Sequence, residues 1–291
     1  MKIIAEIGCN HQGNMASAKK LIDTAASFCN ADAVKFQKRH PKELLSEEEY
    51  SRPHPVPHNS FGETYGEHRE FLEFDIDQHK QLSDWCSQAG IEYSCSVWDV
   101  TSAKEIASLK PQWVKVPSAC NLNSKLLAYL ADEYDGEIHI SLGMTTQAEE
   151  ETIVAFLDKR KRAKDVVLYN CTSGYPVAFE DLGLLEIPRL IERFGSTVKG
   201  IGFSGHHLGI AADIAAVTLG AQYVERHFTL DRTMKGTDHA ASLEPDGLRK
   251  LVRNIECVQT ALSPKREEIL EVEKVQREKL KKNQIQWNES D

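Results

Sequence analysis

The chain has 291 residues, of which 41% are hydrophobic and 27% charged, so it is long enough to bury the core of one large domain or two small ones. Lysine and arginine total 35 against 44 aspartates and glutamates, which gives a formal net charge of −9 without a long basic run. This balance argues against a nucleic acid or an anionic membrane as the main partner.

Two features of the sequence bear on the compartment. The apolar stretch at the start is too short for a signal-peptide core or a membrane span, which predicts a cytoplasmic protein. The seven cysteines are odd in number, scattered and without a CxxC pair. We therefore expect reduced thiols rather than a disulfide framework or a zinc cluster.

Eight short β-rich apolar runs alternate with segments of helical periodicity. The predicted strands are residues 2–8, 32–37, 91–97, 112–117, 137–142, 165–170, 197–203 and 221–228. Eight such units in about 260 residues predict a (β/α)₈ (TIM) barrel, because an open doubly wound sheet usually has fewer strands and a glycine-rich phosphate turn. No GxGxxG or GxxxxGK[ST] motif follows any run, which argues against nucleotide binding of those two kinds.

The connection after the second predicted strand, residues 38–76, is too long for a minimal loop and is rich in His, Pro and Glu. It is either a lid or substrate-contact segment, or a solvated insertion without a role.

The predicted organisation is a barrel domain over residues 1–262 and a charged helical tail over residues 263–291. Within the tail, residues 264–283 predict an exposed helix that packs on the barrel or on a partner. Its thin apolar stripe consists of Ile269, Val272 and Val275.

Polar side chains end every predicted strand, where a barrel interior has no packing reason to keep them. They are Glu6, Lys35 with Gln37, Ser96, Lys115 with Ser118, Ser141, Asn170, Ser204 with His206, and Glu225 with His227. Because active sites of this fold lie at the carboxyl ends of the strands, their recurrence predicts one site at the barrel mouth.

Lys35 and Lys115 lie inside apolar strands, where a buried ammonium is costly unless it meets an anion. The pair therefore predicts a phosphate or carboxylate site. The hydroxyl donors that accompany it are Ser118, Ser141 and Ser204. The alternative is that each lysine pairs with a barrel glutamate such as Glu6 or Glu225.

His206 and His227 end neighbouring strands, which brings two imidazoles within reach of one ion. Asp238 and His239 follow on the last loop and add a ligand or a substrate contact. Such donors suit Mn²⁺, Fe²⁺, Co²⁺ or Zn²⁺ acting as a Lewis acid. The alternative is a pair of histidines that only hydrogen-bond within the barrel.

Seven segments resemble, in order, the motifs of the N-acetylneuraminate (sialic acid) synthase family. They are IAEIGCNHQG, DAVKFQ, WVKVPSA, SLGMTT, NCTSGYPV, GFSGHHLGI and ERHFTLDRTMKGTDHAASLEPD. The resemblance covers residue 3 to about residue 250. It implies a (β/α)₈ enzyme that condenses phosphoenolpyruvate with the open-chain aldehyde of a sugar, releases phosphate and gives a 3-deoxy-2-ulosonic acid.

The resemblance also implies roles for individual residues. The expected phosphoenolpyruvate ligands are Lys35, Lys115, Ser118, Ser141 and Ser204, with Ser96 as a further hydroxyl on the phosphate side. His206 and His227 match the metal-ligand pair, for which we expect Mn²⁺, with Mg²⁺ or Co²⁺ as alternatives. Glu6, Gln37, Tyr175 and Asp238 match positions at the reacting centre or on the sugar, Glu6 and Asp238 being expected to take part in catalysis with the two lysines.

The family relationship further implies a homodimer, a place in carbohydrate biosynthesis and a C-terminal antifreeze-protein-like domain. The tail over residues 263–291 is too short for that domain, so we expect the N-acetyl contact it provides to be missing or made elsewhere. The connection over residues 38–76, or the tail, would then close the site. Cys120 stands where the family has a carboxylate that contacts the sugar.

Two other functions remain open from the sequence. One is a pyruvate aldolase, either metal-dependent or using Lys115 as a Schiff-base nucleophile. The other is a non-catalytic barrel that binds a sugar acid. We favour the synthase, because it assigns a role to both lysines and both histidines.

Overall fold

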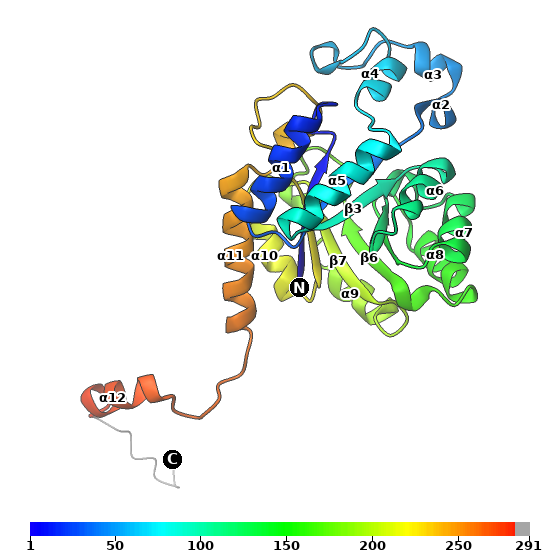
Figure 1. Ribbon diagram of the computed structural model, residues 1–291. Coiled ribbons are helices and arrows are strands. Elements are labelled where there is room, and N and C mark those ends of the chain that lie inside the picture. Colours follow the sequence, from blue (N-terminus) through cyan, green and yellow to red (C-terminus); the bar gives the residue numbers. More distant parts are fainter. Residues whose placement is uncertain (283–291) are drawn as a thin grey trace.

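The computed structural model describes residues 1–282, and in it eight parallel strands close into a barrel (Figure 1). The strands are β1 (Lys2–Gly8), β2 (Ala33–Lys38), β3 (Glu92–Val97), β4 (Trp113–Val116), β5 (Glu137–Ser141), β6 (Val166–Cys171), β7 (Gly200–Gly205) and β8 (Tyr223–His227). Each strand pairs with its sequence neighbours, and β8 closes on β1. The predicted (β/α)₈ barrel is confirmed.

An outer layer of helices covers the strands. It consists of α1 (Met15–Ser27), α5 (Ile76–Ala89), α6 (Val100–Ser108), α7 (Ser124–Glu133), α8 (Gln147–Lys159), α9 (Glu186–Phe194), α10 (Ala211–Thr218) and α11 (Pro245–Ala261). Several begin at a side-chain cap that accepts a backbone N–H three residues on, which satisfies a donor that the first turn leaves free. The caps are Asn14, Asp75, Asp99, Asn123 and Thr146.

One predicted strand is displaced along the chain: the seventh, expected at 197–203, is observed at Gly200–Gly205. The N–H groups of Thr197 and Val198 both donate to the carbonyl of Phe194, at 2.8 and 2.9 Å. These residues therefore complete the turn after α9, and their β-branched side chains do not belong to the strand.

The barrel interior is closed below the mouth by a layer of large side chains. Trp113 and Tyr169 pack there with small and aliphatic residues of other strands, and the ring of His139 stacks on Trp113 at 4.3 Å. A Cβ added to Gly202 would lie 2.6 Å from the Tyr169 ring, so the absence of a side chain makes room for the tyrosine. The mouth is therefore a pocket with a packed floor.

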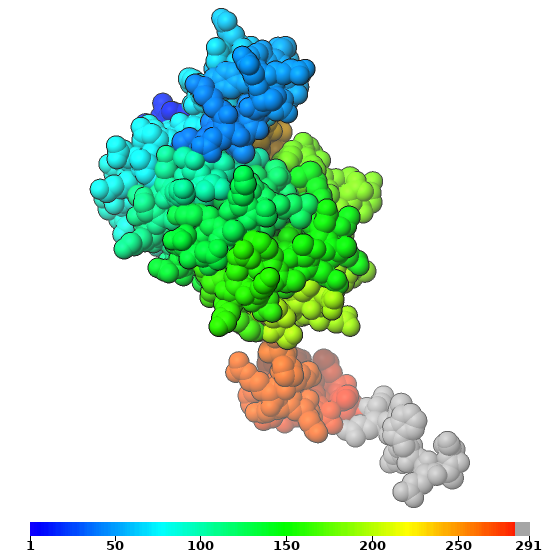
Figure 2. Space-filling model, turned by 90° about the vertical axis from the view of Figure 1, so that its right-hand side faces the viewer, coloured from blue at the N-terminus to red at the C-terminus, as the bar shows by residue number. Residues whose placement is uncertain are grey.

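Residues 39–75 form an insertion that stands on one end of the barrel (Figure 2). It contains α2 (Pro41–Leu44), α3 (Glu47–Ser51), a short 3₁₀ turn (Pro57–Asn59) and α4 (Tyr65–Phe71). The insertion lies at the end where the strands finish, opposite the start of β1 (Figure 1). The long connection predicted after the second strand is thus folded and borders the mouth.

The C-terminal tail differs from its prediction. Its helix, α12 (Glu271–Leu280), begins seven residues after the expected residue 264. The helix starts there because the Glu273 carboxylate accepts the N–H of Leu270 and pairs with Lys265. Val272 and Val275 are exposed, and α12 lies beyond the barrel end opposite the insertion (Figure 1), so it does not cover the mouth. The rest of the predicted tail, residues 283–291, lies outside the described residues.

Within residues 1–282, none of the helices is long and apolar enough to cross a membrane.

Candidate active site

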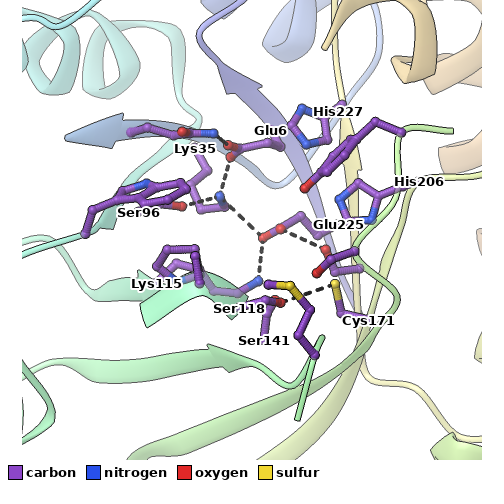
Figure 3. A pocket seen from close by; sticks show the side chains of 18 residues that line it. Glu6, Lys35, Ser96, Lys115, Ser118, Ser141, Cys171, His206, Glu225 and His227 are labelled. Carbon is purple, nitrogen blue, oxygen red and sulfur yellow. Dashed lines mark hydrogen bonds and ion pairs between the residues drawn. The ribbon is translucent and has the colours of Figure 1, made fainter. Parts of the chain in front are cut away.

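Every strand contributes a side chain to a cavity of about 300 Å³ at the barrel mouth (Figure 3). In strand order these are Glu6, Lys35, Ser96, Lys115, Ser141, Cys171, Ser204 and Glu225. Successive side chains of a strand point to opposite faces, and these eight lie on the face that points into the barrel. The structure thus brings side chains of all eight strands together, with Cys171 rather than the expected Asn170 from β6.

Two lysines and two glutamates form a buried charge network in this cavity. The Lys35 ammonium pairs with Glu6, lies 3.7 Å from Oε2 of Glu225 and donates to Ser96 Oγ at 2.6 Å. Lys115 Nζ lies 3.0 Å from the same Glu225 oxygen. The alternative weighed for the lysines, pairing with barrel glutamates, therefore holds in this structure, and Glu225 bridges the two cations.

Burial and pairing set the charges of this network. Burial raises the pKa of Glu6 above its usual 4.5, although Lys35 opposes the shift. Burial alone would also raise the pKa of Glu225, but Lys115 and Lys35 outweigh it and hold the pKa well below the usual range. Protonation of Glu6 would thus leave two ammonium groups facing one carboxylate. Such an excess of positive charge suits an anionic ligand.

The same pocket places hydroxyl groups beside the lysines. Ser204 Oγ donates to Glu225 Oε1 at 3.1 Å, and Ser118 Oγ accepts the N–H of Gly143 at 3.1 Å. Asn121 ties the neighbouring loops together, because its amide donates to the carbonyl of Ser141 at 3.0 Å. These bonds fix the hydroxyls in place before any ligand binds.

His206 and His227 lie side by side at the rim, with ring centroids 5.4 Å apart. His206 Nδ1 lies 3.1 Å from the carbonyl of Thr172, which makes Nδ1 the protonated nitrogen and leaves the Nε2 lone pair free. Burial lowers the pKa of His206 to about 3, so the ring is neutral, as metal binding requires. Among the residues that the structure describes, the buried Nδ1 of His227 has no hydrogen-bond partner, and Asp238 Oδ2 lies 3.9 Å from it.

These donors fit a divalent ion held by two imidazoles. Among residues 1–282, no group of three or more His, Cys, Asp or Glu side chains is arranged to hold a metal. The remaining coordination positions would therefore fall to water or substrate oxygens, as in catalytic metal sites with open positions.

A second cavity, of about 270 Å³, adjoins the first and shares four lining residues with it, Gln37, Trp98, Tyr175 and His227. Asp238 lines this second cavity rather than the first. The ring of Tyr175 lies between the two, 4.5 Å from the His206 ring. Two further predicted residues do not line the first cavity: the amide of Asn170 donates to the carbonyl of Gly183 at 3.1 Å, and His239 Nδ1 is bonded to the Thr229 hydroxyl at 2.7 Å. The other predicted site residues line it.

Sequence reasoning missed several residues of the two cavities. Glu225 was expected at the mouth and as a partner for the lysines, but not as a residue with a role toward substrate, and Cys171, whose pKa burial raises, was not expected in the site. Arg39, stacked 5.0 Å from the Trp98 ring, and Arg69 line the second cavity and lie in the insertion. A cation directly after a strand was a usable signal for Arg39, whereas nothing local distinguishes Arg69. His207, the residue after His206, is buried against Asp213 and Arg226.

Known proteins resemble this chain over most of its length. The model of the NeuB family matches residues 21–267. The N-acetylneuraminate-9-phosphate synthase of Mus musculus is 38% identical over 97% of this chain and 77% of that protein. The N,N′-diacetyllegionaminic acid synthase of Campylobacter jejuni is 34% identical over 89% of this chain and 77% of its own length.

A solved structure is also similar to this chain over most of its length. The N-acetylneuraminic acid synthetase of Leptospira borgpetersenii, in complex with citrate, superposes with a TM-score of 0.80 and 28% sequence identity. The match covers 97% of this chain and 92% of that one.

Proposed function

The chain belongs to the NeuB family, and from this premise we propose that it condenses phosphoenolpyruvate with an open-chain aldose to give a 3-deoxy-2-ulosonic acid and phosphate. The observation that carries the proposal is the occurrence of an anion site and a metal-ligand pair in one cavity: Lys35 and Lys115 beside His206 and His227. The aldose is N-acetylmannosamine-like or a related sugar.

In this proposal the lysine end of the cavity holds phosphoenolpyruvate. Its anionic groups lie against Lys35 and Lys115, which keep their ion pairs with Glu6 and Glu225. Hydroxyl donors then complete the site, and their positions are Ser96, Ser118, Ser141 and Ser204. Because these groups are already fixed, little reorganisation accompanies binding.

The sugar occupies the rim and the second cavity, where Gln37, Tyr175 and Asp238 line its path. Sialic acid synthases of this family are generally metal-dependent, and we propose Mn²⁺, with Mg²⁺ or Co²⁺ as alternatives, held by His206 and His227. When bound, the ion would act as a Lewis acid on the aldehyde oxygen.

The chemistry joins C3 of phosphoenolpyruvate to the aldehyde carbon, and water adds to C2. Collapse of the resulting tetrahedral carbon breaks the C–O bond and expels phosphate. Glu6 is placed to accept the proton of that water, because Gln37 Nε2 donates to its Oε1 at 2.8 Å and Lys35 pairs with Oε2. Burial raises its pKa, which makes the carboxylate a better proton acceptor than an exposed glutamate.

The test is phosphate release from phosphoenolpyruvate by metal-stripped protein, with and without Mn²⁺, against a panel of aldoses. The panel contains N-acetylmannosamine, mannose, arabinose and their phosphates. Metal-dependent release with one sugar is the expected result. Borohydride reduction in the presence of pyruvate should leave Lys115 unmodified; a trapped adduct would favour the aldolase. Lack of phosphoenolpyruvate binding would contradict the anion site.

We also propose a homodimer and a cytoplasmic location, which rest on the family resemblance and the sequence. Light scattering on the purified chain measures the first, and fractionation of cells measures the second.

A further inference from the structure

The indole of Trp98 is a wall of both cavities to which the proposed reaction gives no part. Four residues line both cavities, Gln37, Trp98, Tyr175 and His227. Gln37, Tyr175 and His227 already have places in the proposal, on the sugar path or in the metal pair. A sugar whose aldehyde lies at His227 and whose far end lies in the second cavity must cross this shared wall. Trp98 is therefore the residue of the crossing that still lacks a role.

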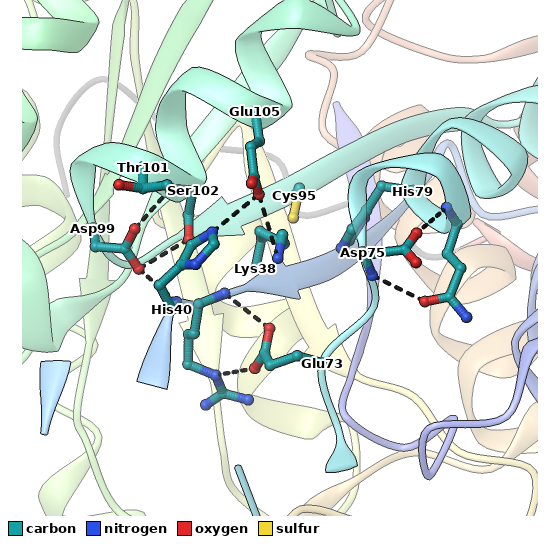
Figure 4. Close-up of polar contacts among 12 residues, drawn as sticks. Lys38, His40, Glu73, Asp75, His79, Cys95, Asp99, Thr101, Ser102 and Glu105 are labelled. Atoms are coloured by element: carbon teal, nitrogen blue, oxygen red, sulfur yellow. Dashed lines mark hydrogen bonds and ion pairs between the residues drawn. The ribbon is translucent and has the colours of Figure 1, made fainter. Parts of the chain in front are cut away.

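Hydrogen bonds fix the backbone of Trp98 on both sides. Its N–H donates to the carbonyl of Lys38 at 3.3 Å, and its carbonyl accepts a bond from the Cys120 thiol at 3.1 Å. The next residue, Asp99, accepts the backbone N–H of His40 at 2.9 Å and caps α6 (Figure 4). The segment after β3 is thus tied to the segments after β2 and β4, which gives Trp98 a fixed position before any ligand binds.

The guanidinium of Arg39 supports the indole ring. Its Cζ lies 5.0 Å from the centroid of the Trp98 ring, within the range of a cation–π contact. The Glu73 carboxylate holds Arg39 in turn, because it accepts Nε at 2.6 Å and the backbone N–H at 2.8 Å (Figure 4). The ring is therefore held in one orientation, and the cation beside it is neutralised by its own partner.

The part of the indole that borders the cavities consists of carbon. Trp98 is only half-buried, yet its Nε1 is buried and has no hydrogen-bond partner among the residues that the structure describes, so the N–H is turned away from the cavities. The groups expected to hold phosphoenolpyruvate are ammonium and hydroxyl groups, which differ from this surface. A carbon surface offers nothing to an anion, but it suits the C–H groups of a sugar chain whose hydroxyls point elsewhere.

We infer that the carbon chain of the aldose stacks on the Trp98 ring where it passes from the first cavity into the second. An aromatic ring that is already fixed loses little conformational freedom when the sugar binds, so the contact adds to affinity. Cys120 lines neither cavity, and its thiol acts on the sugar site only through the Trp98 carbonyl. This inference rests on the proposed function, because it assigns a contact to the sugar of that reaction.

The first test measures the Kd for phosphoenolpyruvate and the KM for the panel sugar that the wild type turns over fastest. The variants are Trp98→Leu, Trp98→Phe and the control Trp85→Leu. Trp85 lies on α5 and also has a cation near its ring, Lys19 at 5.8 Å, but it lines neither cavity. We expect Trp98→Leu to raise the sugar KM roughly five- to tenfold and Trp98→Phe to raise it less than about threefold. The phosphoenolpyruvate Kd should stay within about twofold in both, and Trp85→Leu should keep both wild-type values.

A second test follows tryptophan fluorescence and does not need the leucine variant to fold. Rapid mixing of the sugar with protein that holds phosphoenolpyruvate and Mn²⁺ should change the wild-type signal. Trp98→Phe should abolish that change, and Trp85→Phe should keep it.

Four results would overturn the inference: an unchanged sugar KM in Trp98→Leu, an equal rise of its phosphoenolpyruvate Kd, the same KM rise in Trp85→Leu, or an unchanged fluorescence signal in Trp98→Phe. Absence of turnover with every sugar would instead contradict the proposed function. The fluorescence of Trp98 would still show in that case whether a sugar stacks on the ring, so the two failures are distinguishable.

Discussion

The ammonium of Lys115 lies over the face of the Tyr169 ring, 3.6 Å from its centroid, while Tyr169 donates to or accepts from His139 Nδ1 at 2.9 Å. The floor of the barrel thus supports a charged group of the mouth directly. A cation over a desolvated aromatic face is held more firmly than its ion pair alone would hold it.

Replacement of the Tyr169 ring should weaken phosphoenolpyruvate binding through Lys115. Tyr169→Leu removes the aromatic face, and a desolvated cation–π contact is worth about 2 kcal/mol, so we expect roughly a tenfold to thirtyfold rise in the Kd for phosphoenolpyruvate. Tyr169→Phe keeps the face and loses only the bond to His139; it should lower stability but change this Kd by less than about threefold. Equal weakening in both variants would contradict a role for the ring. Calorimetric titration measures the Kd.

Glu6→Gln should retain phosphoenolpyruvate binding and lose turnover. Glutamine preserves the bond geometry with Gln37 but cannot accept the proton of the attacking water, so kcat should fall by roughly 10²–10⁴-fold. Because burial raises the Glu6 pKa, wild-type activity should decline as the pH falls through a value above 4.5, and the variant should lack that limb. Full turnover by the variant would remove Glu6 from this role.

Metal binding should depend on both rim histidines. His206→Gln and His227→Gln each remove one of the two imidazoles, so we expect the Mn²⁺ affinity to fall by more than tenfold, measured by the electron paramagnetic resonance of free Mn²⁺. His58→Gln, on the exposed surface of the insertion, is the matched control and should bind Mn²⁺ as the wild type does. Unchanged affinity in both rim variants would place the metal elsewhere.

The buried pair of Arg226 and Asp213 should contribute strongly to stability. Both side chains are fully buried, and Asp213 also faces His207 Nε2 at 3.3 Å, which links β8 to α10. Asp213→Asn leaves Arg226 as an uncompensated buried charge and should lower the free energy of unfolding by about 3–5 kcal/mol. The exposed pair of Arg193 and Glu151 is the control, and Glu151→Gln should change stability little. Denaturant titration compares the two; similar losses would contradict the assignment.

Stability should fall below neutral pH because of buried histidines. His79 is fully buried against Tyr93, which lies 2.8 Å from Nδ1, and burial lowers its pKa from 6.5 to about 3. Between these values the unfolded chain binds the proton and the folded chain does not, so the free energy of unfolding decreases as the pH falls. At pH 4.5 the expected loss from this one group is roughly 2–3 kcal/mol relative to pH 7.

The combined variant His79→Phe with Tyr93→Phe removes both polar partners and isolates this effect. We expect its unfolding free energy to depend less on pH by that amount, whereas Tyr93→Phe alone, which keeps His79, should retain the wild-type slope. Parallel slopes in all three proteins would contradict the assignment.

The strands were predictable because a barrel strand needs apolar side chains over its whole length, and six of the eight runs match within one residue at their starts. The strand β8 begins two residues after its predicted start. The strand β7 begins three residues late because Thr197 and Val198 form a turn rather than part of the sheet. The capping pairs Ser46 with Glu49 and Thr64 with Glu67 are visible in the sequence, so helices within the insertion were also within reach.

Which side chains meet one another in the folded chain was not predictable from the sequence. That Glu225 lies between Lys35 and Lys115 follows from the stagger of a closed barrel, which brings β8 across from β4. The position of Arg69 in the second cavity depends on how α4 packs on α3, and an exposed arginine on a short helix has the same local pattern. Both the ion pairs of Glu225 and the position of Arg69 depend on contacts between segments that are distant in the sequence.

Because each of the eight strands supplies one side chain to the cavity, the catalytic apparatus exists only when the ring of strands is complete. A half-barrel would hold some ligands of each substrate and all ligands of neither. Turnover should therefore require a closed barrel. Two fragments of this chain should each be inactive alone and should regain turnover only when they reassociate.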